Sequence, residues 1–249
     1  MKNDCFGDRM KKYENVFSYR VIQNMPTIVR LDGICFHSFT KNFDKPFDSL
    51  FQDYMYRTAL SLCQKIHNTK LAYIQSDEIS ILLIDYYRKE TDQTFDGKIN
   101  KIISHTASIA TSEFIRNYIS NNKWFLQEDI DLNLIDLPKF DSRVFQLPKE
   151  EVCNYFIWRQ KDAERNSISM YARSIMSHKE MFQKSCKQLQ EDLFMNGINW
   201  NDCPTKNKRG VCVIKKNENW NIDQEIPVFT QNRNYIDDIV FYNGDDNDS

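Results

Sequence analysis

Strand-forming and helix-forming patterns of apolar residues alternate along the first part of the chain. Residues 22–31 and 71–84 are rich in β-branched and other large apolar side chains, which is typical of strands, and a further element is expected near Tyr86. A short strand is predicted over 142–147. Helical spacing of apolar residues predicts three helices in the same part of the chain, over 1–20, 47–66 and 98–120.

The second part of the chain is mainly helical by the same criterion. Helical spacing begins near Lys149, directly after Pro148, and continues with breaks to about Met195. A basic, turn-rich loop over 201–210 then leads into a strand over 211–216. No internal repeat is visible in this order of elements.

This order predicts an α+β fold. Residues 1–147 contain the strand–helix–strand units of a ferredoxin-like domain, an antiparallel sheet with helices packed on one face. Residues 148–235 are expected to form a helical segment and a C-terminal strand that pack on this domain. Residues 236–249 are acidic and poor in core-forming side chains, so a disordered tail is expected there.

Composition narrows the class of protein. A net charge of −2 excludes a uniformly basic surface, so a nucleic-acid partner would have to be held by local patches or by the combined surface of an oligomer. Seven cysteines without a CxxC pair indicate free thiols in a reducing compartment. No apolar run reaches membrane-spanning length and no signal peptide is visible. We therefore expect a soluble intracellular protein with no membrane partner, in the cytoplasm, with an organelle left open.

Two acidic motifs interrupt the apolar strands. Asp32 and Gly33 end the first predicted strand, and Asp77 and Glu78 lie inside the second. If the strands are neighbours, Asp32 and Asp77 converge and repel each other unless a cation lies between them. Mg²⁺ suits such a place, and two ions could clamp a phosphoryl transfer. An Asp-Gly turn and a helix N-cap at Ser76 remain structural alternatives.

Five motifs occur in the chain in an order and spacing that can be compared with those of known protein families. They read VRLDGICFHSFTKNFDKPFD, YIQSDEIS, SHTAS, FDSRV and WRQKDAERNSI. In order and spacing they resemble the tRNA(His) guanylyltransferase family over roughly residues 5–215. The resemblance implies a palm-like catalytic domain within residues 1–147 and two-metal nucleotidyl transfer that adds nucleotides to the 5′ end of tRNA in the 3′-to-5′ direction. It also implies Mg²⁺ as cofactor, GTP and ATP as substrates, and a homotetramer.

The resemblance also assigns residues to roles. Asp32, Asp77 and the carbonyl of Gly33 match the metal ligands, and Glu78 joins the two aspartates as a catalytic acid. The positions that match nucleotide and phosphate contacts are Asp32, Gly33, Ile34, Cys35, Phe36, His37, Lys45, Asp48, Ser76, Asp77, Lys98, Lys101 and Asn166. Contacts with RNA are expected from Arg159 and Arg165, whose guanidinium groups match phosphate oxygens, and from Lys208 and Arg209 in the basic loop.

Two departures from the family pattern affect the expected substrate. Ile34 stands where the family usually has arginine, and Glu164-Arg165-Asn166-Ser167 stands where the eukaryotic enzymes have His-Ile-Asn-Asn. This pattern resembles the guanylyltransferase-like branch, which repairs 5′-truncated tRNA by templated addition. The alternatives are guanylate addition to tRNA(His), a nucleotide cyclase with the same two-aspartate centre, and a non-catalytic tRNA-binding module.

Overall fold

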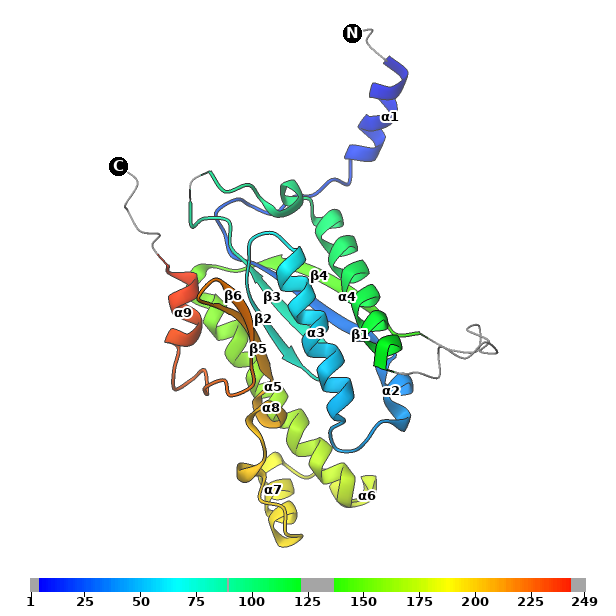
Figure 1. Ribbon diagram of the computed structural model, residues 1–249, viewed down its shortest axis with the longest axis vertical. Coiled ribbons are helices and arrows are strands. Elements are labelled where there is room, and N and C mark those ends of the chain that lie inside the picture. Colours follow the sequence, from blue (N-terminus) through cyan, green and yellow to red (C-terminus); the bar gives the residue numbers. More distant parts are fainter. Residues whose placement is uncertain (1–4, 89, 122–136, 243–249) are drawn as a thin grey trace.

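The computed structural model describes residues 5–88, 90–121 and 137–242 (Figure 1). Its centre is an antiparallel sheet in the order β4-β1-β3-β2-β5-β6. The strands are β1 (Thr27–Ile34), β2 (Thr69–Gln75), β3 (Glu78–Leu83), β4 (Lys139–Gln146), β5 (Val211–Lys216) and β6 (Asn219–Asp223). The helices are α1 (Cys5–Asn15), α2 (Phe36–Phe39), α3 (Ser49–Lys65), α4 (Ile99–Asn121), α5 (Lys149–Ile175), α6 (His178–Met181), α7 (Cys186–Met195), α8 (Thr205–Arg209) and α9 (Asn234–Val240).

The first four strands and two of the helices form the predicted ferredoxin-like unit. They follow one another as β1-α3-β2-β3-α4-β4 and lie in the sheet in the order β4-β1-β3-β2. The α+β class is therefore confirmed. One prediction about the strands was wrong: residues 71–84 form a hairpin rather than a single strand, because the chain turns back at Ser76 and Asp77.

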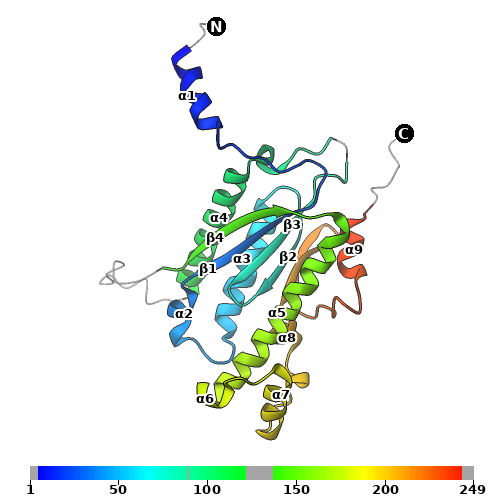
Figure 2. The same cartoon turned by 180° about the vertical axis from the view of Figure 1, so that it is seen from behind.

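Helices cover both faces of the sheet, whereas the sequence pattern indicated one. On one face α3 and α4 pack against Val29, Leu31 and Ile81. On the other, α5 and α9 pack against Ile28 and Leu82 (Figure 2). The physical reason is that every residue of β3 is buried, so neither face of this central strand tolerates exposure to water.

The C-terminal part departs from the predicted tail. Ile236 and Val240 lie on α9 and are fully buried against the sheet, so the expected disorder is wrong for the residues of this helix. Residues 243–249 lie outside the described part of the chain. The division between 147 and 148 falls between β4 and α5, and it remains a prediction. The strands β5 and β6 extend the same sheet at the edge of β2.

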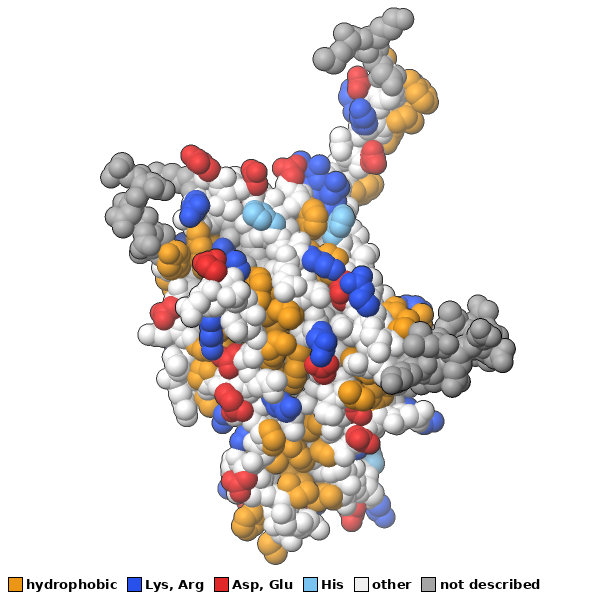
Figure 3. Space-filling model, in the orientation of Figure 1, with side chains coloured by type: hydrophobic (Ala, Val, Ile, Leu, Met, Phe, Trp, Pro, Cys, Tyr) orange, Lys and Arg blue, Asp and Glu red, His pale blue; other side chains and the backbone are white. Residues whose placement is uncertain are grey.

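One helix stands away from the rest of the molecule. The helix α1 projects from the body in Figures 1 and 2, and none of its residues is buried. Phe6, Met10 and Tyr13 are exposed on it, and hydrophobic side chains gather along one side of α1 in Figure 3. Among the described residues, no helix is both long enough and apolar enough to cross a membrane.

Candidate active site

The hairpin turn between β2 and β3 brings the predicted aspartates together. Asp32 in β1 is the direct antiparallel partner of Glu78, the first residue of β3, and Asp77 immediately precedes it in the turn. Ser76, the other turn residue, adopts a left-handed conformation with φ 48°. The two motifs, distant in sequence, therefore meet at one end of the sheet.

The carboxylate of Asp77 is held in an environment that disfavours its charge. Burial raises its pKa above the ordinary value, and the nearby negative charge of Asp32 raises it further. Hydrogen bonds from its own backbone and from the Ser76 hydroxyl oppose this rise without cancelling it. Among the residues that the structure describes, no lysine or arginine forms an ion pair with Asp77.

The donor set fits Mg²⁺. Asp32 is 41% exposed, with Oδ2 at 4.0 Å from Nη2 of Arg143, so its carboxylate remains open to a ligand. Together with the Gly33 carbonyl, Asp32 and Asp77 offer only oxygen donors. Within the described ranges no three residues of the His, Cys, Asp and Glu types cluster as a metal site. A cation held by two carboxylates that completes its shell with water and substrate phosphate is the arrangement that Mg²⁺ prefers.

Gly33 is required by the close approach of an aromatic ring. A Cβ at this position would lie 2.3 Å from Cδ2 of Phe36, which is far inside van der Waals contact. The ring of Phe36 cannot move away, because it packs among Phe51, Phe114 and Phe140. The aromatic core thus fixes the backbone immediately after Asp32.

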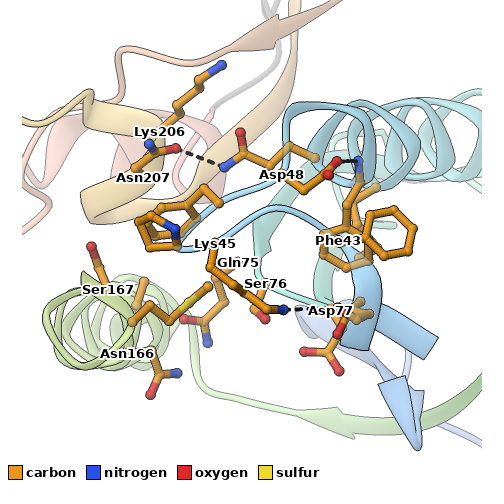
Figure 4. Close-up of a pocket in the computed structure, with 18 of the residues that line it drawn as sticks. Phe43, Lys45, Asp48, Gln75, Ser76, Asp77, Asn166, Ser167, Lys206 and Asn207 are labelled. Carbon is orange, nitrogen blue, oxygen red and sulfur yellow. Dashed lines mark hydrogen bonds between the residues drawn. The ribbon is translucent and has the colours of Figure 1, made fainter. Parts of the chain in front are cut away.

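A cavity of about 540 Å³ opens beside Asp77 (Figure 4). Its walls come from the segment between α2 and α3, from α3, from the β2–β3 turn, and from α5 and α8. The predicted nucleotide contacts that line it are Phe36, His37, Lys45, Asp48, Ser76, Asp77 and Asn166. Asp32, Gly33, Ile34 and Cys35 do not line it; they lie at and just beyond the end of β1, next to the turn.

Two of the predicted contacts already have partners within the chain. The Nζ of Lys45 donates to the carbonyl of Thr40 at 2.9 Å, which leaves its other protons for a ligand. Both carboxylate oxygens of Asp48 accept backbone hydrogen bonds, from Phe51 at 2.8 Å and from Asp44 at 3.1 Å. Asp48 is thus the N-cap of α3 and fixes the wall of the cavity.

The sequence prediction missed a large part of the wall. Missed lining residues include Phe43, Phe47, Gln52, Gln75, Ser167, Met170, Arg173, Ser174, Lys206 and Asn207. On α5, Met170 follows Asn166 by four residues and Arg173 follows Met170 by three, so these residues share one helical face, with Ser167 and Ser174 next to them in sequence. This spacing would have identified Met170 and Arg173 once Asn166 was assigned. On the opposite wall, Gln52 donates to Asn207 at 2.8 Å and joins α3 to α8.

Two of the predicted RNA contacts conflict with the burial of their side chains. Arg159 is only 6% exposed, and its guanidinium is bonded to Glu78 and Asp162. Lys208 is 7% exposed and donates to the carbonyl of Asn201. Neither side chain can reach an RNA backbone without leaving the fold.

The other two predicted RNA contacts remain accessible. Arg165 is exposed and pairs with Asp162 at 2.7 Å. Arg209 is partly exposed, with Nε at 3.7 Å from Glu164. Surface ion pairs cost little to break, so the exposed guanidinium of Arg165 could exchange its carboxylate for a phosphate, whereas Nε of Arg209 is buried and only the rest of its guanidinium could do so.

Lys98 and Lys101 lie far from the cavity within one chain. Phe114 of α4 packs against Phe36, with ring centroids 5.4 Å apart. Lys98 precedes it by sixteen residues, which corresponds to about 24 Å along a helix. Its Nζ lies 3.6 Å from Asp96, at the other end of the sheet. The predicted triphosphate contact is therefore not made at this cavity by the same chain.

Glu78 also departs from its predicted role. Nε of Arg159 donates to Oε1 at 2.8 Å, and Nη2 donates to Oε2 at 2.9 Å. Nε of Arg30 lies 3.7 Å from Oε2. Since both oxygens face arginines in a buried position, the direct catalytic contact predicted for Glu78 conflicts with its geometry.

Comparison with known proteins identifies the family. The family model described as tRNAHis guanylyltransferase matches residues 7–148. The tRNA(His) guanylyltransferase of Saccharomyces cerevisiae is 32% identical over 206 residues, which cover 77% of this chain and 83% of that protein. The chain belongs to the tRNA(His) guanylyltransferase family. It is accordingly a tRNA 5′-end nucleotidyltransferase, and the family resemblance is confirmed.

Solved structures agree with this assignment. A bacterial tRNA(His) guanylyltransferase-like protein in complex with ATP superimposes with a TM-score of 0.87 at 40% identity, over 95% of this chain and 99% of that chain. The crystal structure of the Saccharomyces cerevisiae enzyme superimposes with a TM-score of 0.67 at 25% identity, over 88% of this chain and 98% of that chain. Family membership leaves the nucleotide cyclase and the non-catalytic module without support.

Proposed function

We propose that this enzyme repairs 5′-truncated tRNA by template-directed addition of nucleotides in the 3′-to-5′ direction. The observation that carries the proposal is the meeting of Asp32 and Asp77 beside a cavity of nucleotide size. Ile34 and the Glu164-Arg165-Asn166-Ser167 stretch support the guanylyltransferase-like branch. So does the higher identity to the bacterial guanylyltransferase-like protein, 40% against 25% for the yeast enzyme structure.

The cavity offers a nucleoside triphosphate two kinds of contact. Phe43 and Phe47 supply apolar surface for a base, while Lys45, Arg173 and Lys206 supply positive charge for phosphates. ATP and GTP are the expected ligands, as the bacterial relative in complex with ATP supports. The cavity volume of about 540 Å³ falls in the range of small-molecule sites.

In the proposed reaction the 3′-hydroxyl of the incoming nucleotide attacks the 5′ α-phosphate of the RNA, and pyrophosphate leaves from a 5′-triphosphate end or a nucleoside monophosphate leaves from an end activated with ATP or GTP. A 5′-monophosphate end is first activated with ATP or GTP. Asp32, Asp77 and the Gly33 carbonyl would hold two Mg²⁺ ions, which when bound activate the hydroxyl and neutralise the leaving group. Lys45, Arg173 and Lys206 orient the triphosphate, and pairing with the opposite RNA strand selects the base.

RNA binding and assembly complete the proposal. Arg165 and Arg209 remain the candidate phosphate contacts, although each has an acidic partner in the free protein. Lys98 and Lys101 would reach a triphosphate only from a second subunit, consistent with the expected tetramer. The exposed apolar side of α1 is available for such an assembly. Light scattering should give four times the mass of one chain.

The decisive experiment offers the enzyme matched tRNA transcripts. Full-length and 5′-truncated tRNAs, each with a 5′-monophosphate or a 5′-triphosphate, are incubated with Mg²⁺ and each labelled nucleoside triphosphate. Truncated tRNAs of several species should be extended, and the added nucleotide should change when the opposite template nucleotide is changed. Addition confined to guanylate on tRNA(His), whatever the template, would establish the alternative activity of the family instead.

A further inference from the structure

The turn that carries Asp77 is attached at both of its ends to the same part of α5. Gln75 and Glu78 are paired across the hairpin and flank the turn. Nε2 of Gln75 donates to Oδ2 of Asp162 at 3.4 Å, and Glu78 is bonded on both oxygens by Arg159. Nη2 of Arg159 also donates to Oδ2 of Asp162 at 2.9 Å and closes the network.

This turn needs support from outside the hairpin. Ser76 has a positive φ of 48°, a conformation that costs energy for any residue with a Cβ, and the turn contains no glycine. Asp77 adds a partly buried negative charge beside Asp32. A two-residue turn under these conditions could relax unless its flanking residues were fixed.

We propose that Arg159 and Asp162 are positioning residues that clamp the turn, so that Asp77 keeps the position required for metal binding. The clamp consists of Gln75, Glu78, Arg159 and Asp162, and the inference rests on the proposed function of the site. Arg159 is suited to it because its planar guanidinium bonds both oxygens of Glu78 at once, which fixes orientation as well as distance.

The same helix connects the clamp to the cavity. One to two turns after Arg159, α5 contributes Ala163, Asn166 and Ser167 to the cavity wall. Gln75 lines this wall as well, and its Oε1 is buried without a hydrogen-bond donor among the described residues. A single rigid helix thus sets both the wall and the turn, and a bound nucleotide can donate to the open acceptor of Gln75.

The test compares Arg159→Gln with a matched variant elsewhere, Glu113→Gln. Glu113 is also a buried carboxylate in ion pairs, but it joins α3 to α4 away from the cavity. Metal affinity is measured with Mn²⁺ by electron paramagnetic resonance, in the presence of a non-hydrolysable GTP analogue. Arg159→Gln should weaken Mn²⁺ binding at least tenfold and raise the Mg²⁺ concentration for half-maximal rate equally, whereas Glu113→Gln should change both less than twofold.

A conservative variant protects the test against misfolding. Arg159→Lys keeps the charge but loses the two-pronged contact, so it should fold and still weaken Mn²⁺ binding about threefold to tenfold. The affinity for the GTP analogue without metal should stay within threefold of wild type in both variants. If the Arg159 variants lower thermal stability but leave Mn²⁺ affinity unchanged, Arg159 is only structural and the clamp is refuted.

The metal measurement separates this inference from the proposed function. If wild-type protein binds Mn²⁺ tightly, loses affinity on Arg159→Gln, but extends no tRNA, the clamp stands and the proposed activity fails. If wild-type protein extends truncated tRNA while the Arg159 variants keep wild-type Mn²⁺ affinity, the activity stands and the clamp fails.

Discussion

Two regions of this molecule bury acidic side chains in opposite ways. Between α3 and α4, Glu113 accepts from Lys65 and pairs with Arg116 at 3.1 Å. Burial raises its pKa, but these two cations lower it more, so the net pKa lies below the ordinary value. In the β2–β3 turn, burial and Asp32 raise the pKa of Asp77 instead, and no lysine or arginine among the described residues pairs with it.

This difference indicates that Glu113 stabilises the fold, whereas Asp77 is placed to bind a ligand. Glu113 receives its counter-charge from its own chain, and its ionised form is stabilised in the free protein. Asp77 is placed beside a like charge, and no lysine or arginine of the described residues pairs with it, so a bound cation is the counter-charge that we propose. Glu78, next to Asp77 in sequence, also receives its counter-charge from the chain, through Arg159, although burial keeps its pKa above the ordinary value. Adjacent acids therefore have different functions.

The largest expected effect is on catalysis. Asp77→Asn should lower the rate of nucleotide addition about a thousandfold or more, or roughly 4 kcal/mol in the barrier, because one of two metal-binding carboxylates is lost. The measurement is single-turnover addition to 5′-triphosphorylated, truncated tRNA at saturating nucleotide. Glu113→Gln serves as control and should keep at least half of the wild-type rate. A fully active Asp77→Asn variant would contradict the assignment of the metal site.

The next effect is on stability at the adjacent acid. Glu78→Gln removes one of the two carboxylates that bond the buried guanidinium of Arg159, the other being Asp162, and should reduce the free energy of unfolding by about 3 kcal/mol. In a chain of this length the thermal midpoint should fall by roughly 6–12 °C. Differential scanning calorimetry measures it. An unchanged midpoint would show that the pair is not holding β3 to α5.

The two lysines of α8 show the same difference between a side chain that can bind a ligand and one that stabilises the fold. Lys206 lines the cavity, whereas Lys208 is buried and bonded to a backbone carbonyl. Lys206→Ala should raise the KM for the nucleotide about tenfold, or roughly 1.4 kcal/mol, with an unchanged thermal midpoint. Lys208→Ala should do the reverse, lowering the midpoint with little effect on KM. Equal effects of both variants on KM would contradict the assignment of Lys206 to nucleotide binding and of Lys208 to the fold.

The fold and the pair of aspartates could be predicted because they depend on local pattern. Apolar periodicity identified α3 and α4, and the five motifs fixed the family. Asp32 and Asp77 were predicted to converge because one ends and the other interrupts an apolar run in strands expected to be neighbours. The turn itself was missed, since Ser76-Asp77 contains no glycine or proline and the apolar residues on both sides have the pattern of one continuous strand.

Side-chain partners could not be predicted from the sequence. Arg159 and Lys208 carry the positive charge that a phosphate-binding residue needs. Only the packing of α5 and α8 shows that both side chains are buried and bonded within the fold. Burial of Ile236 and Val240 depended likewise on a sheet face formed by strands far away in sequence. Composition described the acidic end of the chain correctly as polar, but it did not reveal the two residues that anchor α9.

A smaller effect is expected where the fold supplies the counter-charge. Glu113→Gln should reduce the free energy of unfolding at pH 7 by about 1 kcal/mol, because its partners Lys65 and Arg116 are 45% and 66% exposed and solvent weakens the pairs. Since the folded pKa is lowered, this stabilisation is present above the ordinary value of 4.5 and is lost as pH falls through the folded pKa below it. Urea unfolding across acidic pH should show wild type and variant converging there.

The smallest expected effect is a gain in thermal stability at the candidate metal site, opposite in sign to the loss expected for Glu113→Gln. In the presence of EDTA, Asp77→Asn should raise the thermal midpoint at pH 7 by about 1–4 °C, the shift expected for 0.5–1 kcal/mol in a chain of this size. The folded pKa of Asp77 is raised, so its ionised form destabilises the native state above that pKa, and the penalty disappears as pH falls toward the ordinary value of 3.8. The advantage of the variant should therefore shrink as the pH is lowered and should vanish when saturating Mg²⁺ and nucleotide stabilise the wild type. A lower midpoint for Asp77→Asn in EDTA at pH 7 would show that Asp77, like Glu113, is stabilised by the fold, and the contrast between the two regions would be lost.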